Sequence, residues 1–337
     1  MRSAYNSDPV GARFRIDVTG VAPPGAESII GDVFAPPQGR LAERPAVAVC
    51  LPGGGMSRRY FDLQVTPELG NYSMARHLAA RGLVVVTLDH LGVGESSRPS
   101  DPYTLTPHVL ADVNAFAVDQ VLERLRRGEL TSTLPALPGL WSVGVGHSMG
   151  SLLSVYQQAR HRSHAGLVLL GFWARGLPSH LCERELRFAG DPDGLAEALA
   201  DLVRQRFGEA LPMPGRGSSD LLVGHAMPGP VHDALVAART HQLAMAGLSS
   251  MIPGSCMPEL SKIDVPVLVA VGDGDITGPL QEIREDFPPA TALSLYELVD
   301  SGHNHNVAST RAQLWDEIVR WVGDITQIDA SPSSSPS

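Results

Sequence analysis

Short, almost continuous runs of apolar residues alternate with longer amphipathic segments from about residue 46 onward. A strand covered on both faces needs such a run, whereas a strand with one face in water alternates between polar and apolar side chains. Strands of the first kind that are joined by helices form parallel sheets with helices on both faces. The pattern therefore predicts an α/β fold. Its central strands are expected at residues 46–51, 83–88, 141–145, 166–170 and 265–271.

The remaining elements complete this sheet. Residues 13–19 alternate between polar and apolar side chains, and residues 28–34 follow after a Pro-Gly turn, so we expect an antiparallel pair at the edge. A last strand is expected at 293–299. Apolar residues at helical spacing predict helices that cover the sheet, at residues 72–81, 107–127, 149–160 and 308–322.

The alternation of strands and helices breaks between residues 172 and 256. This segment is rich in helix formers and contains clusters of Pro and Gly. We interpret it as a helical cap, inserted into an α/β core that comprises residues 1–171 and 257–326. The tail at 327–337 is mostly Ser and Pro, so we expect it to be disordered. The helices expected within the cap cover residues 195–206 and 231–246.

Composition argues against several classes of protein. A net charge of −10 gives no electrostatic basis for binding nucleic acid, which needs basic surface. The apolar runs are far shorter than the roughly 20 residues of a membrane span, and residues 1–20 lack the apolar stretch of a secretory signal. Cys50, Cys182 and Cys256 have neither disulfide nor zinc-site spacing. We therefore expect a cytoplasmic protein without a membrane span or metal.

Residues 141–150 combine an expected strand, the pentapeptide GHSMG and the start of an expected helix. A serine on such a sharp turn exposes its hydroxyl, and the crowded backbone leaves no room for side chains two residues away on either side. Gly146 and Gly150 meet that requirement. The following helix start also favours negative charge nearby. Ser148 is therefore the candidate nucleophile.

A candidate acid and a candidate base follow two later strands. The strand expected at 265–271 runs into a loop with Asp273 and Asp275, and chemistry in open α/β sheets lies at the carboxyl ends of strands. We prefer Asp275 as the acid, with Asp273 as the alternative. His303 follows a glycine that permits a sharp turn toward the sheet edge, whereas His305 is expected to begin or flank the final helix. His303 is the preferred base.

The chain order Ser148, Asp275, His303 is the order nucleophile, acid, base of one class of hydrolytic triad. In such a triad His303 takes the serine proton as the serine attacks a carbonyl. Asp275 then orients the imidazole and stabilises its positive charge. Each of these three residues alone is weak evidence for a catalytic site, but their order along the chain makes the interpretation as a triad stronger.

The oxyanion that forms in this attack needs two backbone N–H donors. Met149, directly after the nucleophile, would supply the first. The second is expected from the glycine loop that follows the first central strand, with Gly54 preferred and Gly55 as the alternative. A phosphate-binding loop is excluded because no Gly-Lys-Ser/Thr sequence follows these glycines.

These motifs resemble those of the capped α/β-hydrolases over nearly the whole chain. The run DHLGVGES at residues 89–96 is similar to the D-x-x-G-x-G-x-S loop of that family, whose role is mainly structural. One departure is Pro52, which stands where many relatives have a histidine before the oxyanion glycines. The resemblance implies that the segment 172–256 covers the active site. Its apolar side chains are candidates for a pocket lining or for the core of the cap: Phe172, Trp173, Met227, Met245, Met251 and Met257.

A serine nucleophile favours cleavage of esters, thioesters, lactones or amides through an acyl-enzyme. We expect hydrolysis of a carboxylic ester, thioester or lactone in a small to medium, largely apolar substrate, without a cofactor. The same triad also serves acyltransferases and C–C bond hydrolases, and a non-catalytic ligand receptor on this scaffold is the alternative from another class. Arg58 and Arg59, beside the glycine loop, are interpreted as solvated charges.

Overall fold

The computed structural model describes residues 11–37, 39–132, 134–214, 227–289 and 291–330. Within these residues one sheet has the strand order β1-β2-β4-β3-β5-β6-β7-β8, and β2 runs antiparallel to both of its neighbours while the other pairs are parallel. The strands are β1 (Gly11–Asp17), β2 (Ser28–Phe34), β3 (Ala46–Leu51), β4 (Val84–Leu88), β5 (Trp141–His147), β6 (Gly166–Leu170), β7 (Val267–Gly272) and β8 (Leu293–Leu298). The mostly parallel α/β sheet and its antiparallel edge pair are confirmed.

Five strands, β1, β4, β5, β7 and β8, differ by one or two residues from their expected bounds, and the differences in β7 and β5 have a local cause. β7 begins at Val267 rather than two residues earlier, because Pro266 has no N–H to donate to a neighbouring strand. β5 continues to His147, since Gly146 pairs with Leu51 of β3 and His147 pairs with β6. The turn that carries Ser148 therefore starts directly at the end of a fully paired strand.

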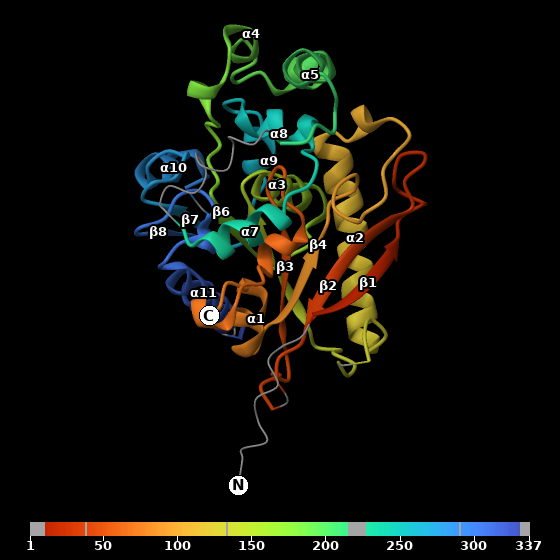
Figure 1. Cartoon of the computed structure of the whole chain (residues 1–337), viewed down its shortest axis with the longest axis vertical. Helices are drawn as coiled ribbons and strands as arrows, with labels where there is room; N and C mark the ends of the chain where they lie inside the picture. Colours follow the sequence, from red (N-terminus) through yellow and green to blue (C-terminus); the bar gives the residue numbers. More distant parts are fainter. Residues whose placement is uncertain (1–10, 38, 133, 215–226, 290, 331–337) are drawn as a thin grey trace, which may run out of the picture.

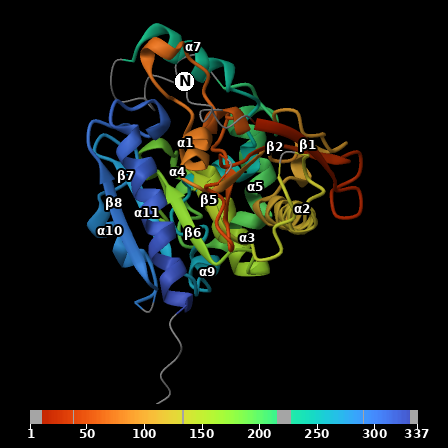
Figure 2. The ribbon, with the colours of Figure 1, turned by 90° about the horizontal axis from the view of Figure 1, so that it is seen from below.

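Helices cover both faces of the sheet. Successive residues of β3 point to opposite sides, so that Val47 and Val49 join the core under α2 and α3, whereas Ala48 and Cys50 join the core under α1 and α11. Figure 2 shows α11 alongside β7 and β8, with α2 at the opposite side near β1. These helices are α1 (Met74–Ala80), α2 (Pro107–Arg127), α3 (Met149–His161), α10 (Leu280–Asp286) and α11 (Arg311–Ala330).

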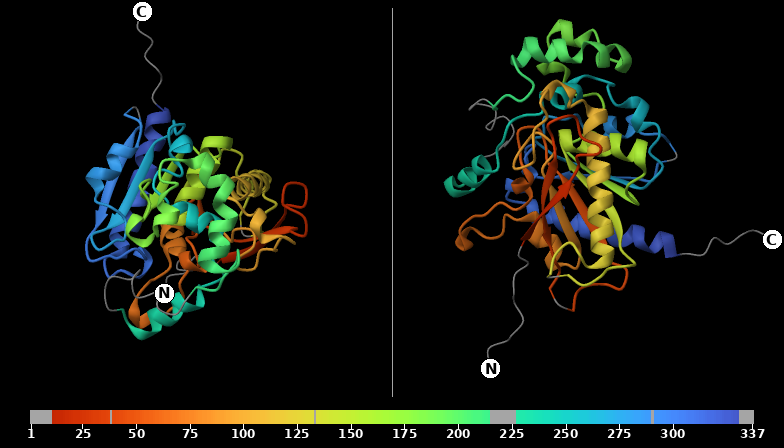
Figure 3. Two further views of the ribbon diagram at one scale, coloured as in Figure 1. Left: turned by 90° about the horizontal axis from the view of Figure 1, so that it is seen from above. Right: turned by 90° about the vertical axis from the view of Figure 1, so that its right-hand side faces the viewer.

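The segment between β6 and β7 is helical, as expected. Its helices are α4 (Glu183–Leu186), α5 (Pro192–Phe207), α7 (Gly229–Ala237), α8 (Ala244–Met251) and α9 (Met257–Leu260). α4 and α5 lie at one end of the molecule, beyond α8 (Figure 1). α5 and α8 share an apolar cluster of their own, which includes Leu199, Leu248 and the predicted pocket residue Met245. α7 stands apart from them (Figure 3) and packs with Val231 and Leu235 on the main core instead.

The prediction of a single helix at 231–246 is wrong. α7 ends at Ala237 and α8 begins at Ala244, and the residues between them are extended. There the N–H of Thr240 donates to the carbonyl of Gly55 at 2.9 Å, and Arg239 forms a β-bridge with Met56. Hydrogen bonds to the glycine loop thus replace the helical ones.

The C-terminal helix also differs from its prediction. α11 begins at Arg311 rather than 308 and runs to Ala330, four residues past the expected end of the core at 326. The first turn is displaced because residues 305–307 form a separate 3-10 helix. The rest of the predicted tail, residues 331–337, lies outside the described residues.

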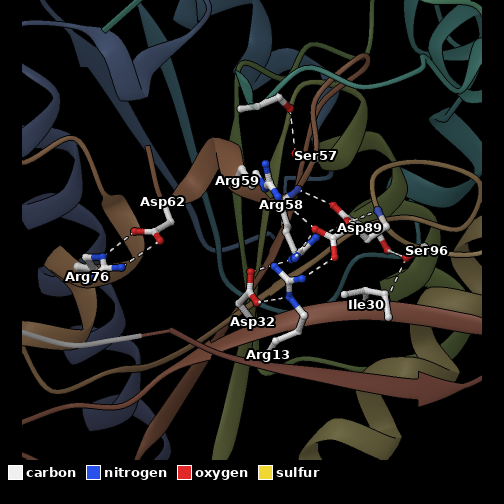
Figure 4. Close-up of polar contacts among 12 residues, drawn as sticks. Arg13, Ile30, Asp32, Ser57, Arg58, Arg59, Asp62, Arg76, Asp89 and Ser96 are labelled. Carbon is white, nitrogen blue, oxygen red and sulfur yellow. Dashed lines mark hydrogen bonds and ion pairs between the residues drawn. The ribbon is translucent and has the colours of Figure 1, made fainter. Parts of the chain in front are cut away.

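Arg58 fastens the glycine loop to the rest of the core. Its side chain is only 1% exposed; Nε lies 2.7 Å from a carboxylate oxygen of Asp32 in β2, and Nη1 contacts Asp89 after β4 (Figure 4). The backbone N–H of Arg58 also donates to Asp89, at 2.7 Å. The interpretation of Arg58 as a solvated charge is therefore wrong, because three carboxylates, including that of Glu95, replace its water. Arg59 is exposed and pairs with Glu95 at 3.2 Å.

The run 89–96 joins β4 to β2. The Asp89 carboxylate accepts a hydrogen bond from the N–H of Glu95 at 2.9 Å. The Ser96 hydroxyl accepts from the N–H of Ile30 and donates to the carbonyl of Asp89, each at 3.0 Å (Figure 4). These hydrogen bonds hold the run 89–96 in place between β4 and β2, which is the structural role that the resemblance implied.

Removal of the Arg58 side chain should destabilise the fold, because the fully buried Asp89 would lose its counter-charge. Loss of one partner of a buried ion pair costs about 3–5 kcal/mol, and we expect Arg58→Ala to lower the free energy of unfolding in urea by that amount. The neighbouring Arg59 provides a matched control, since its side chain is 56% exposed. Arg59→Ala should change stability by less than about 1 kcal/mol. Equal effects of the two substitutions would contradict the role given to Arg58.

Candidate active site

Ser148 lies on a strained turn between β5 and α3. Its φ of 55° and ψ of −121° place it in a region that residues with a side chain rarely adopt. A Cβ on Gly146 would lie 2.4 Å from Cα of Ser151, and a Cβ on Gly150 would lie 2.2 Å from the carbonyl oxygen of Leu51. Both positions therefore exclude any side chain, which is the requirement that the sequence predicted.

His303 and Asp275 form a buried pair. Nδ1 of His303 lies 2.7 Å from Oδ1 of Asp275, and the two side chains are 5% and 1% exposed. Burial raises the pKa of Asp275, but attraction to His303 and hydrogen bonds from His303 and His305 outweigh it and hold that pKa well below its ordinary value. Asp275 is therefore an anion that accepts hydrogen bonds.

Asp273, the alternative acid, lies elsewhere in the same loop. Its carboxylate accepts hydrogen bonds from the backbone N–H groups of Asp300 and Ser301, each at 3.0 Å. These bonds hold the loop after β7 against the loop after β8. The structure thus brings Asp275, and not Asp273, to the ring of His303.

His305 also reaches Asp275, which the sequence reasoning missed. Its Nε2 lies 3.1 Å from Oδ2 of Asp275, and its side chain is 1% exposed. His305 begins a separate 3-10 helix rather than the final helix α11, and its ring turns inward because its N–H donates to the carbonyl of His303 in a tight turn. The spacing of two residues between the histidines was the available signal, since such a turn lets both rings face one carboxylate.

His147 supports the backbone of His303. Its Nε2 lies 2.9 Å from the carbonyl oxygen of His303, and its ring stacks against that of Tyr60 with the centroids 4.6 Å apart. Burial, together with the nearby His303 and His305, lowers the pKa of His147 well below its ordinary value, so the ring is neutral. A carbonyl can only accept, and therefore the proton of His147 is on Nε2.

Ser148 and His303 line one small cavity with about 370 Å³ of space, part of it open to solvent. Nδ1 of His303 is occupied by Asp275, which leaves Nε2 as the nitrogen for chemistry in the cavity. His305 is not among the lining residues. Of the predicted pocket residues, Phe172 and Trp173 line the cavity. The other side chains of its wall are Leu152, Leu177, Ser250, Ile276 and Thr277.

The glycine loop lies against Ser148. A Cβ on Gly53 would be 3.1 Å from Cβ of Ser148, and one on Gly54 would be 4.0 Å from the sulfur of Met149. Gly55 is turned toward the cap segment, because its carbonyl accepts the N–H of Thr240. Gly54 and Met149, the preferred oxyanion donors, are thus neighbours.

The described ranges contain neither a cluster of metal-ligating side chains nor a helix that could span a membrane. Among these residues, no three His, Cys, Asp or Glu side chains are grouped so that they could hold a metal ion. None of the helices in the same ranges combines the length and the apolar character that crossing a bilayer requires.

The structure is similar to several solved hydrolytic and oxidative enzymes. They include an esterase from Thermogutta terrifontis (TM-score 0.55, 16% identity, 93% of this chain and 99% of that chain), an esterase from Exiguobacterium antarcticum (0.58, 18%, 88% and 96%) and a bromoperoxidase from Bacillus anthracis (0.56, 18%, 93% and 100%). At such identities the likeness shows the fold alone. A search of curated proteins finds no significant match. The model of the Alpha/beta hydrolase family matches residues 48–317, more than half of the sequence, and the chain therefore belongs to the alpha/beta hydrolase family.

Proposed function

We propose that the protein hydrolyses a carboxylic ester, thioester or lactone through an acyl-enzyme formed on Ser148. The observation that carries this proposal is that Ser148 and His303 line the same cavity, while the other ring nitrogen of His303 is bonded to the buried Asp275. Two of the similar structures are those of esterases, which supports the ester class. A serine that attacks an ester carbonyl gives an acyl-enzyme that water can cleave.

In the proposed mechanism Nε2 of His303 accepts the proton of Ser148 as the serine oxygen attacks the substrate carbonyl. Asp275 stabilises the imidazolium that forms, and the N–H groups of Met149 and Gly54 donate to the oxyanion. His303 then protonates the leaving alcohol, and the acyl group remains on Ser148. A water molecule, deprotonated by His303, attacks the acyl-enzyme, and His303 returns this proton to the oxygen of Ser148 as the acid is released. Each step uses groups of this chain and water, so the reaction needs no cofactor.

The lining of the cavity bears on the kind of substrate proposed. Leu152, Phe172, Leu177 and Ile276 make much of its wall apolar. This lining supports a substrate with a largely apolar part beside the scissile bond. Leu177 belongs to the segment 172–256, which supports the view that this segment acts as a cap.

The role of Ser148 predicts covalent labelling. A fluorophosphonate should modify Ser148 in the folded protein, because it forms a stable adduct only with a serine that a neighbouring base activates. Ser148→Ala should take up no label, and its ester turnover should fall by at least about 10³-fold. Its melting temperature should stay the same or rise, since alanine carries no polar group in the strained turn. Mass spectrometry of peptides locates the adduct. A folded wild-type protein that takes up no label would contradict the proposal.

The two histidines should differ in importance. His303→Ala should lower kcat by about 10³-fold or more, because it removes the proton acceptor. His305→Ala should lower kcat by about tenfold, the value of one hydrogen bond to the carboxylate of Asp275. Steady-state kinetics on a nitrophenyl ester measures both. The assignment of the base would be wrong if His303→Ala kept its activity and His305→Ala lost it.

The two aspartates provide a matched pair of substitutions. Asp275→Asn should lower kcat by about 10³–10⁴-fold, because an amide facing His303 favours the wrong tautomer and cannot stabilise the imidazolium. Asp273→Asn, in the same loop, should cost less than about tenfold, since its carboxylate accepts hydrogen bonds from the backbone N–H groups of Asp300 and Ser301. The same kinetic assay serves. If Asp273→Asn lowered kcat more than Asp275→Asn does, Asp273 and not Asp275 would be the acid.

A further inference from the structure

Two polar atoms in the wall of the catalytic cavity are buried and have no hydrogen-bond partner among the residues that the structure describes. They are Nε1 of Trp173 and Oγ1 of Thr277, and both residues line the cavity together with Ser148. Burying a donor without a partner destabilises a folded protein, so nearly all such groups are paired. An unpaired polar group in the wall of a binding cavity therefore indicates that its hydrogen-bond partner is an atom of the ligand.

The two groups lie on adjoining walls. Trp173 belongs to the loop after β6 and Thr277 to the loop after β7. The Trp173 indole packs flat against Gly278, since a Cβ there would lie 2.6 Å from Cε2 of the ring. Cε2 is bonded to Nε1, and Gly278 follows Thr277 directly. The indole edge that carries the N–H is therefore close to the Thr277 segment.

Both groups are held in place by the surrounding structure. The N–H of Thr277 donates to Oδ1 of Asp275 at 3.2 Å, which ties Thr277 to the proposed acid. Two residues after Trp173, Arg175 pairs with Asp286 at 2.9 Å and with Glu282 at 3.1 Å on α10. The loop that carries Trp173 is thus anchored to the helix that follows Thr277. A fixed donor pair is preorganised for a ligand atom.

Much of the remaining wall is apolar: Leu152, Phe172, Leu177 and Ile276 line it, and the Ser250 hydroxyl donates to the carbonyl of Gly247 at 2.7 Å. An indole N–H can only donate, and a threonine hydroxyl can donate as well. Two donors in the wall of one small cavity match a ligand oxygen, which has two lone pairs.

We propose that the natural substrate carries, near its scissile carbonyl, an ether, hydroxyl or carbonyl oxygen that accepts hydrogen bonds from Trp173 and Thr277. This inference rests on the proposed ester hydrolysis. It narrows the substrate class from plain alkyl esters to oxygenated esters. The two side chains set specificity and take no part in bond cleavage.

Pairs of esters that differ by one atom test the proposal. Ethyl 3-methoxypropanoate and ethyl pentanoate differ by an oxygen in place of a methylene in the acid part. 2-Methoxyethyl acetate and butyl acetate differ in the same way in the alcohol part. In at least one pair, the wild-type protein should cleave the ether-containing ester with a kcat/KM about tenfold higher than that of its all-carbon counterpart. The reason is that a methylene group cannot accept hydrogen bonds, so both donors stay unpaired when the all-carbon ester binds.

Variants separate recognition from intrinsic reactivity, which is the same for every enzyme form. Thr277→Val and Trp173→Phe each remove one donor and keep the bulk of the side chain. Each should reduce the ether preference by about threefold to tenfold. Thr277→Ser keeps the hydroxyl and should retain the wild-type preference. Fluorophosphonate labelling of Ser148 in every variant shows that the catalytic groups are intact.

The outcomes distinguish this inference from the proposed function. The inference is overturned if the wild-type protein prefers the ether in neither pair, or if either donor-removing variant keeps the full preference. It is also overturned if Thr277→Ser loses the preference as Thr277→Val does. If Ser148 takes up no label and none of the four esters is cleaved, ester hydrolysis itself is wrong.

Discussion

The strained turn at Ser148 is the constraint on which the rest of the site depends. Its positive φ costs on the order of 1–3 kcal/mol and persists only because neighbouring strands fix it. The N–H of Ser148 donates to the carbonyl of Leu170 at the end of β6, and α3 passes so close to the end of β3 that Gly150 nearly touches the Leu51 carbonyl. Three parallel strands and one helix thus converge on a single hydroxyl, and the loops that carry Asp275 and His303 follow the next two strands.

Charge is balanced around one buried carboxylate. Asp275 accepts hydrogen bonds from two imidazoles, and only one of them, His303, faces the cavity. The second, His305, occupies the other carboxylate oxygen and so limits rotation of Asp275. Neutral His147 holds the main chain of His303 without adding charge. In the proposed reaction, the positive charge that forms on His303 therefore meets a fixed anion in a site shielded from water.

The glycine loop after β3 links the core to the cap segment. On one side, the buried Arg58 ties it to β2 and to the loop after β4. On the other, the carbonyl of Ala238 accepts hydrogen bonds from both the N–H and the hydroxyl of Ser57, and Thr240 donates to Gly55. A shift of the segment between α7 and α8 would strain these bonds. The position of the proposed oxyanion donor Gly54 is thus coupled to the position of the cap segment.

The sequence alone predicted the sheet, its edge pair and the glycines around Ser148, because each depends on local periodicity or on backbone crowding between close neighbours. It also placed Asp275 and His303 at strand ends. The tertiary structure decided what depends on partners far along the chain. The expected helix at 231–246 is broken by bonds to the glycine loop, Arg58 is buried by carboxylates from separate strands, and His305 turns toward an anion thirty residues earlier. Such pairings leave no periodic signal, since only folding brings their members together.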